Sequence, residues 1–312
     1  MNKCVIFFFI IVNGLLLVAG CGKKEKIELN RTSVTVIQEN KGDIDIDIQV
    51  VDDIDFNIVL PDIPNLKVVL KAKGCNEYEF LGWVDLENDK EIGIDPNLIL
   101  ENKYGKIRAH FRKRPKEIMG ENLLAAVGKE TTLGFYEPDD LELIDTEQQE
   151  YKGKKLRKEA AIALRKLLEA ARKDGVLFKV KSAYRSYKTQ ERIFNRYKTI
   201  YGVLNSEKFS ARPGQSEHQL GTALDFGGTQ FDFTDEFENT LQGEWLLQNA
   251  FLYGFVLSYP QDSEKKTGYI YEPWHYRYIG IEQAKELKLS GLTLIEYLSQ
   301  LDKQYTNDRL NK

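Results

Sequence analysis

The sequence predicts an α+β protein in which a small β-rich region precedes a larger domain of mixed helices and strands. In the first third of the chain, apolar and polar residues alternate with the two-residue period of strands. Helical spacing of apolar residues begins only after about residue 150. Helices and strands do not alternate there as strictly as in a doubly wound parallel sheet, which favours α+β over α/β.

The N-terminus predicts an export signal rather than part of the fold. Lys3 is followed by an apolar run over residues 4–19, which fits a signal peptide over residues 1–20. The run ends in Leu17-Val18-Ala19-Gly20-Cys21, which resembles a bacterial lipobox. The resemblance implies that a lipid on Cys21 anchors an extracytoplasmic protein to the cell membrane. Charged residues 21–30 then predict a short tether.

Residues 31–114 predict a small β-rich domain. The segment 43–48 alternates aspartate with isoleucine, which is typical of a strand with one solvated face, whereas a calcium loop needs bends and glycine at fixed places. The Phe80-Leu81-Gly82-Trp83 stretch and a later Ala109-His110-Phe111 resemble the small β-grasp-type repeats of bacterial surface proteins, and we interpret His110 as structural. Strands are expected over residues 33–36, 43–48, 68–72, 78–83 and 107–111.

Residues 115–305 predict the second domain, after an irregular border over residues 115–150 that is rich in proline and acidic residues. Gly175 fits the stop of the first helix. Helices are expected over residues 154–173, 188–201, 244–253, 282–289 and 292–301, and strands over residues 176–180, 220–226, 255–257 and 270–278.

The charge balance is that of an ordinary soluble protein. The net charge is −4, so no basic surface indicates a nucleic-acid partner. The chain has three histidines, and two of them lie in segments that carry other chemically active residues.

The segments 182–186, 216–225 and 272–275 contain the residue types of a catalytic metal site. Such a site commonly takes three ligands from imidazoles and carboxylates and leaves a position for water. His218 and His275 offer imidazoles, and Asp225 offers a carboxylate. Glu272 precedes His275 by three residues and has the chemistry of a general base, while Arg185 offers a fixed cation for an oxyanion or a substrate carboxylate.

The order of these residues resembles a known family. Ser216-x-His218-x6-Asp225, followed by Glu272-Pro273-Trp274-His275 and preceded by Tyr184-Arg185-Ser186, is similar to the pattern of the VanY-type D-alanyl-D-alanine carboxypeptidases and their L,D-carboxypeptidase relatives. The resemblance covers about residues 120–300. It implies a peptidase domain with a mixed or antiparallel sheet flanked by helices.

The resemblance also implies roles for individual residues. His218, Asp225 and His275 would bind Zn²⁺, Glu272 would activate a zinc-bound water as the catalytic base, and Arg185 would stabilise the oxyanion. Three further residues are expected to bind substrate: Ser216, Gln190 and Tyr184. The substrates would be peptidoglycan stem peptides that end in D-alanine, and the hydrolysed bond would be of the D-Ala-D-Ala or the L,D type.

Three other functions are compatible with the sequence. The same apparatus could serve a peptidoglycan endopeptidase that cuts cross-links. The chain could be a wall-binding lipoprotein with a degenerate peptidase domain, although intact ligand positions argue against this. The β-rich region could itself act as an adhesin. The sequence leaves D,D- and L,D-cleavage open because both use the same metal ligands.

Overall fold

The computed structural model describes residues 24–29, 32–38, 47–51, 55–60, 67–101, 105–144 and 153–310. The chain divides into two compact units after Arg114, with residues 202–204 grouped with the first unit. The predicted signal peptide and Cys21 lie outside the described residues. Within the described residues, no helix combines the length and the apolar character that a membrane span requires.

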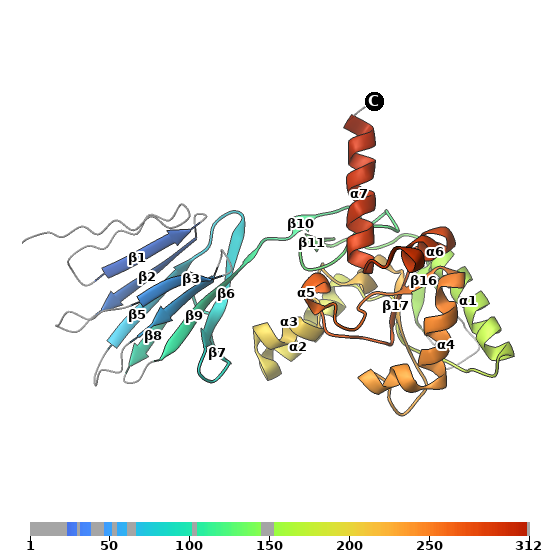
Figure 1. Ribbon diagram of the computed structural model, residues 1–312, viewed down its shortest axis with the longest axis horizontal. Coiled ribbons are helices and arrows are strands. Elements are labelled where there is room, and N and C mark those ends of the chain that lie inside the picture. The colour runs from blue at the N-terminus through green and yellow to red at the C-terminus, as the bar shows by residue number, and fades with distance from the viewer. Residues whose placement is uncertain are drawn as a thin grey trace, which may run out of the picture. The chain divides into compact units, whose positions relative to one another are not determined.

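The first unit consists of two antiparallel sheets (Figure 1). One sheet has the order β1-β2-β5-β8, with β1 (Lys24–Leu29), β2 (Thr32–Gln38), β5 (Lys67–Lys73) and β8 (Asn97–Glu101). The other has the order β3-β4-β9-β6-β7, with β3 (Asp47–Val51), β4 (Asp55–Val59), β9 (Lys106–Lys113), β6 (Tyr78–Asp85) and β7 (Lys90–Gly93).

Both sheets contribute side chains to one core, so they pack face to face. Val68 and Leu70 of β5 belong to the same buried cluster as Phe56, Trp83 and Phe111 of the other sheet. No helix occurs among the described residues 24–113, and the resemblance to β-grasp-type repeats stays a prediction.

His110 has the structural place expected of it. Its Nδ1 lies 2.7 Å from a carboxylate oxygen of Asp55, which is 4% exposed and also accepts the backbone amide of Phe111. The pair links β4 and β9 at the edge of the core.

Residues 24–29, which we expected to belong to the tether, form strand β1 instead. Their backbone pairs with β2 in an antiparallel register that joins Lys24 to Ile37 and Leu29 to Thr32. The apolar residues Ile27 and Leu29 alternate with charged ones, a two-residue period that the charge of the segment obscured.

The second unit is built around an antiparallel sheet with the order β14-β15-β17-β16, flanked by helices, which confirms the predicted α+β class. Its strands are β14 (Lys179–Ser182), β15 (Ala223–Gly227), β17 (His275–Tyr278) and β16 (Phe255–Leu257). Two small ribbons precede the sheet: β10 (Lys116–Glu117) with β11 (Thr131–Thr132), and β12 (Leu141–Leu143) with β13 (Lys155–Arg157).

Helix α1 (Lys158–Lys173) packs against one face of this sheet and forms the core of the unit. Its buried Leu164 and Leu167 cluster with Leu224 of β15 and Tyr276 of β17. The helix begins four residues later than expected, because residues 155–157 pair with β12, a contact that helical periodicity cannot report.

The end of α1 follows the prediction. Gly175 has a left-handed φ of 79° and donates its amide to the carbonyl of Arg172, while the amide of Val176 reaches back to Ala171. These two hydrogen bonds form the Schellman motif, in which glycine avoids the strain of a Cβ at positive φ.

The helices after α1 are α2 (Tyr187–Tyr201), α3 (Val203–Phe209), α4 (Leu241–Asn249), α5 (Glu264–Thr267), α6 (Ile281–Ser290) and α7 (Leu294–Leu310), with the short 3-10 turns η2 (Glu217–Leu220), η3 (Asp235–Asn239) and η4 (Ala250–Tyr253). The helices predicted after α1 are present with shifted ends, while α3 and α5 were not predicted. Strand β17 is shorter than predicted, because residues 270–274 form a turn in which the His275 amide binds the Glu272 carbonyl.

Candidate metal centre and active site

The central strands of the second sheet place two of the predicted ligands opposite each other. Asp225 of β15 pairs directly with His275 of β17. Side chains alternate along a strand, so those of Asp225 and His275 point to one face of the sheet. Leu224 and Tyr276 point to the opposite face, where they pack under α1. The Asp225 Oδ1 atom lies 3.0 Å from His275 Nδ1, and both side chains are buried.

The third predicted ligand comes from η2. His218 lies in this turn, which ends at Gly221 with a left-handed φ of 73°. A side chain at Gly221 would be strained by that φ and would crowd Leu141 and Arg157. The turn brings His218 Nε2 to 3.3 Å from Asp225 Oδ2, and one ligand atom from each of His218, Asp225 and His275 lies within 4.8 Å of the others.

The hydrogen bonds around the three side chains suit a bound cation. His218 Nδ1 lies 2.8 Å from the carbonyl of Ala183, which can only accept, so Nδ1 carries the proton and the Nε2 lone pair faces Asp225. Tetrahedral ligands about 2.1 Å from a zinc ion lie about 3.4 Å apart, close to the 3.0 Å and 3.3 Å observed. Two imidazoles and one carboxylate are also a common donor set for zinc.

Burial and neighbouring charges shift the pKa values of all three donors. Burial alone would raise the pKa of Asp225, but His218 and His275 hold it far below its ordinary value, so the carboxylate is charged. Burial lowers the pKa of His218, which favours the neutral imidazole that a metal needs. Burial would also lower the pKa of His275, yet Asp225 and Glu217 raise it to about 10, so a metal that binds this imidazole must displace a proton from it.

Glu272 lies at the edge of the cluster. Its Oε2 atom is 3.8 Å from His275 Nδ1, and its side chain is 12% exposed. Burial raises the pKa of Glu272 to about 8, against the lowering effect of His275 and with a further rise from Asp225. A carboxyl group with a pKa in this range can accept and return a proton near neutral pH.

Arg185 lies beside Asp225 in the cluster. Its Nη2 atom is 3.9 Å from Asp225 Oδ2, and its side chain is 20% exposed. Two hydrogen bonds fix the guanidinium group: Nη1 donates to Gln190 Oε1 at 2.7 Å, and Nη2 donates to Ser182 Oγ at 2.9 Å. The backbone amide of Arg185 donates to the His218 carbonyl, which ties this segment to η2.

The residues expected to bind substrate occupy different positions. Gln190 is 1% exposed. Its Oε1 accepts a hydrogen bond from Arg185, and its Nε2 donates to the carbonyl of Ala211 at 2.6 Å. Ser216 is buried at the start of η2. Tyr184 is half-buried, and burial together with the nearby Glu137 carboxylate raises its pKa to about 12.

Comparison with known proteins agrees with this geometry. The profile of the VanY family, described as D-alanyl-D-alanine carboxypeptidase, matches residues 153–281, which include all three candidate ligands. A putative carboxypeptidase YodJ of Bacillus subtilis is 40% identical over 189 residues, which cover 59% of this chain and 69% of that relative. A D-alanyl-D-alanine carboxypeptidase of Enterococcus faecalis is 39% identical over 145 residues, 44% of this chain and 53% of the relative.

The chain belongs to the VanY family of D-alanyl-D-alanine carboxypeptidases. It is therefore a hydrolase of the D,D- or L,D-carboxypeptidase class. Solved structures share the fold: the LdcB LD-carboxypeptidase has a TM-score of 0.54 at 38% identity, covering 59% of this chain and 90% of that one. The D,D-dipeptidase VanXYg, in complex with a D-Ala-D-Ala phosphinate analogue, has a TM-score of 0.51 at 28% identity, covering 57% and 70%.

This member of the VanY family has further buried residues at the site that the sequence analysis missed. Glu217 lies 3.0 Å from His275 Nε2 and also binds Ser258 and Arg277. Burial alone would raise the pKa of Glu217, but Arg277 and His275, with Ser258, hold it at about 2. A usable signal existed for Arg277, which follows His275 by two positions on a strand and so shares its face.

Tyr259 is another neighbour that the sequence analysis missed. Its ring lies against the imidazole of His275, with ring centroids 4.9 Å apart and planes inclined by 34°. Burial raises the pKa of this phenol well above its ordinary value, so Tyr259 is neutral. It packs beside the ligand without adding charge.

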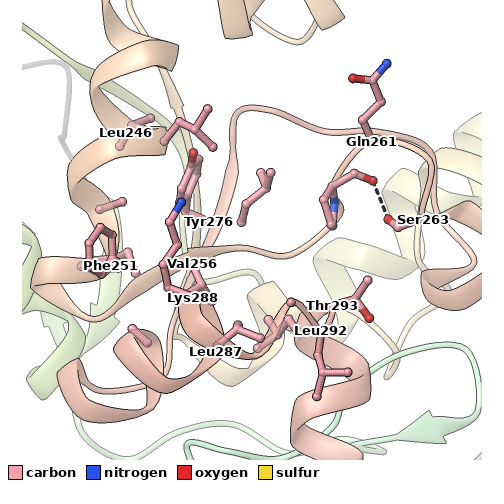
Figure 2. A pocket seen from close by; sticks show the side chains of 18 of the residues that line it. Leu246, Phe251, Val256, Gln261, Ser263, Tyr276, Leu287, Lys288, Leu292 and Thr293 are labelled. Carbon is pink, nitrogen blue, oxygen red and sulfur yellow. Dashed lines mark hydrogen bonds between the residues drawn. The ribbon is translucent and has the colours of Figure 1, made fainter.

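A separate cavity of about 410 Å³ lies between η4, β16, α6 and the start of α7 (Figure 2). Its lining is mostly apolar and includes Phe251, Val256 and Leu287. None of the residues predicted for the site lines it. Tyr276 does, and its two neighbours on β17, His275 and Arg277, lie on the other face of that strand. The cavity is therefore not the place where the candidate catalytic residues meet.

Proposed function

We propose that this chain is a zinc-dependent carboxypeptidase that removes the terminal D-alanine from peptidoglycan stem peptides. The observation that carries the proposal is the buried cluster of His218, Asp225 and His275, with Glu272 beside His275 and Arg185 beside Asp225. These five residues come from four separate segments, and the fold brings them within a few ångströms of one another. The names of the relatives, which include D,D- and L,D-carboxypeptidases, support the substrate class.

The three ligands would be His218 Nε2, one oxygen of Asp225 and His275 Nδ1. When bound there, zinc supplies a Lewis acid that polarises a carbonyl and acidifies a water. Glu272 takes a proton from the water that attacks the last peptide carbonyl. It then delivers that proton to the nitrogen of the leaving D-alanine, which completes the cleavage.

Arg185 would stabilise the negative oxygen that forms during attack. Its planar guanidinium is already fixed by Gln190 and Ser182, so little reorganisation is needed as the charge develops. We assign Gln190 to the orientation of Arg185 rather than to the substrate. Ser216 and Tyr184 stay proposals for substrate contacts.

Release of D-alanine from defined muropeptides tests this function. The full chain is offered a pentapeptide ending in D-Ala-D-Ala and, separately, a tetrapeptide ending in a single D-alanine. Each reaction is run with and without a chelator, and with zinc added back. Chelator-sensitive release from the first substrate identifies a D,D-enzyme, and release from the second an L,D-enzyme.

Two results would contradict the proposal. Release that a chelator does not affect would exclude the metal, and the absence of release from both substrates by a zinc-loaded chain would exclude the carboxypeptidase. In the second case, cleavage of cross-linked dimers would identify an endopeptidase. Binding to wall without any cleavage would identify a degenerate binding protein.

We also propose that a lipid on Cys21 anchors the chain outside the cytoplasmic membrane. The support is the pattern that ends in Ala19-Gly20-Cys21 after an apolar run. A Cys21→Ser chain expressed in a bacterium with the lipoprotein pathway should incorporate no labelled fatty acid and should leave the membrane fraction. Equal labelling of both chains would exclude the anchor.

A further inference from the structure

Glu217 is a buried carboxylate whose three partners all belong to the active-site side of the domain. It is 4% exposed. One oxygen, Oε2, accepts a hydrogen bond from Ser258 Oγ at 2.6 Å and lies 3.0 Å from His275 Nε2. The other, Oε1, accepts from Arg277 Nη1 at 2.9 Å. No oxygen of Glu217 faces solvent, so the carboxylate serves groups inside the protein.

Arg277 extends this network to a distant part of the chain. It is fully buried, and its Nη2 atom donates to the carbonyls of Leu123 at 2.8 Å and Ala125 at 2.7 Å. Both carbonyls lie outside residues 153–281, the stretch that the family profile matches. The guanidinium therefore joins the upstream segment to Glu217, and Glu217 joins it to His275.

Glu217 decides which nitrogen of His275 carries a proton. A carboxylate can only accept, so the Nε2 atom that faces it must hold the hydrogen. Nδ1 faces another acceptor, Asp225 Oδ1, at 3.0 Å, so a proton or a cation has to lie between these two atoms. With a metal bound at Nδ1 the proton must be on Nε2, because the opposite tautomer would leave Nε2 and Glu217 as two acceptors 3.0 Å apart.

We propose that Glu217 is a positioning residue that fixes the tautomer and ring orientation of His275 for metal binding, and that Arg277 in turn holds Glu217 in place. This inference rests on the proposed function in assigning His275 as a metal ligand. The arrangement is reciprocal: the η2 segment supplies one ligand, His218, and orients the other, His275. Carboxylates that bind the second nitrogen of a ligand histidine typically contribute about 10- to 100-fold to metal affinity.

A merely structural ion pair is the competing interpretation, and the stability of the variants separates the two. Removing Glu217 alone would leave the Arg277 charge buried without a counterion, which destabilises a protein strongly. Replacing both charges by apolar residues of similar volume is often neutral for stability. The double variant E217M/R277M therefore removes the ion pair while leaving His275 without an acceptor at Nε2.

The experiment measures zinc affinity by competition with a chelator, and the melting temperature of the zinc-free form, for the full chain and its variants. We expect folded E217M/R277M to bind zinc about 10- to 100-fold more weakly, with a melting temperature lowered by the loss of the Arg277 donors to Leu123 and Ala125. E217Q keeps one oxygen acceptor, so its zinc affinity should fall less than that of the double variant. The control Glu159→Gln removes an equal charge from the carboxylate that binds Tyr278, next to Arg277 on β17, and should leave zinc affinity unchanged.

Zinc affinity of the double variant within about threefold of the original chain would overturn the proposal, since that is well below the effect expected of an orienting carboxylate. If the double variant does not fold, Ser258→Ala replaces it, because it removes one hydrogen bond to Glu217 with little change in volume. Weaker zinc binding by a folded Ser258→Ala chain supports the proposal, and unchanged binding overturns it.

The proposed function can fail separately. An original chain that binds zinc but releases no D-alanine contradicts the peptidase, while the ratio of zinc affinities still tests Glu217. An original chain that binds no divalent metal overturns both.

Discussion

Asp225 and His275 are direct partners in the antiparallel ladder of β15 and β17, and the sheet itself sets the 3.0 Å between their ligand atoms. The backbone hydrogen bonds of the two strands hold these two proposed ligands in register. Such preorganisation is more exact on strands than on loops. It also means that each ligand can be changed chemically without moving the backbone that carries it.

Asp225→Asn should abolish tight zinc binding while preserving the fold. The amide has nearly the shape of the carboxylate but carries no charge. Residues that only touch a ligand already contribute about 10- to 100-fold to metal affinity, so the loss of a ligand should exceed about 100-fold. Chelator competition measures the affinity, and emission spectroscopy measures the zinc that remains after dialysis.

Asp232→Asn is the matched control for this change. Asp232 accepts hydrogen bonds from the amides of Gly228 and Thr229 in the loop just after β15, away from the three ligands. Its variant should keep full zinc binding. Undiminished zinc binding by Asp225→Asn would remove this residue from the ligand set.

Glu272→Gln should separate metal binding from turnover. The amide fits the same space but cannot accept a proton from water, so D-alanine release should fall by about 10²- to 10⁴-fold. The amount of bound zinc should stay within about twofold of that of the original chain, because Glu272 is not one of the three proposed ligands. The exposed Glu264 provides a control, Glu264→Gln, that should change neither quantity.

Release of D-alanine at the original rate by zinc-loaded Glu272→Gln would show that another group moves the proton. Loss of zinc from this variant would instead show that Glu272 helps to hold the metal. D-alanine release and bound zinc must both be measured on the same preparation to distinguish these two outcomes.

Arg185→Lys should lower kcat and leave zinc affinity unchanged. Lysine keeps the positive charge, but it cannot reproduce the planar fork that binds Gln190 and Ser182 at the same time. Loss of one oxyanion donor typically lowers kcat by about 10²- to 10³-fold. Steady-state release of D-alanine at saturating zinc measures the change. An equal fall in zinc affinity would indicate that Arg185 supports the ligands through Asp225 rather than the oxyanion.

The sequence motifs named residues that the structure brings together, but not the network behind them. The order of His218, Asp225, Glu272 and His275 resembles a family pattern, and ligand atoms of three of these residues lie within 4.8 Å of one another. Glu217 stands inside one of these motifs, but its role depends on a partner that is 58 positions away. Contacts of this length follow from the register of β15 and β17, which local periodicity does not contain.

The fold was predictable to a similar degree. The α+β class and the order of the elements followed from periodicity, and the stop of α1 followed from Gly175. Residues 155–157 were assigned to the helix because their apolar spacing continues that of α1, whereas pairing with β12 makes them a strand. Residues 24–29 were assigned to a tether because charge dominates their composition, although they pair with β2.

The start of α7 gives a pH-dependent prediction that does not involve the metal site. Glu296 Oε2 accepts the amide and the hydroxyl of Thr293, the residue before the helix, at 3.0 Å and 2.8 Å. These bonds, together with Lys266, hold the pKa of Glu296 at about 2. An unfolded glutamate titrates near pH 4.3, so the contribution of Glu296 to stability is present above about pH 4.3 and is lost as the pH falls towards 2.

Glu296→Gln should therefore reduce the free energy of unfolding by about 1 kcal/mol at pH 7, the usual loss for a helix cap, and by about half as much at pH 3. Urea unfolding of both chains at the two pH values measures the difference. The exposed Glu282 offers a control, Glu282→Gln, because it pairs with the solvent-exposed Lys285 and such pairs contribute little. A loss of equal size at both pH values would show that the carboxylate charge of Glu296 does not stabilise the start of the helix.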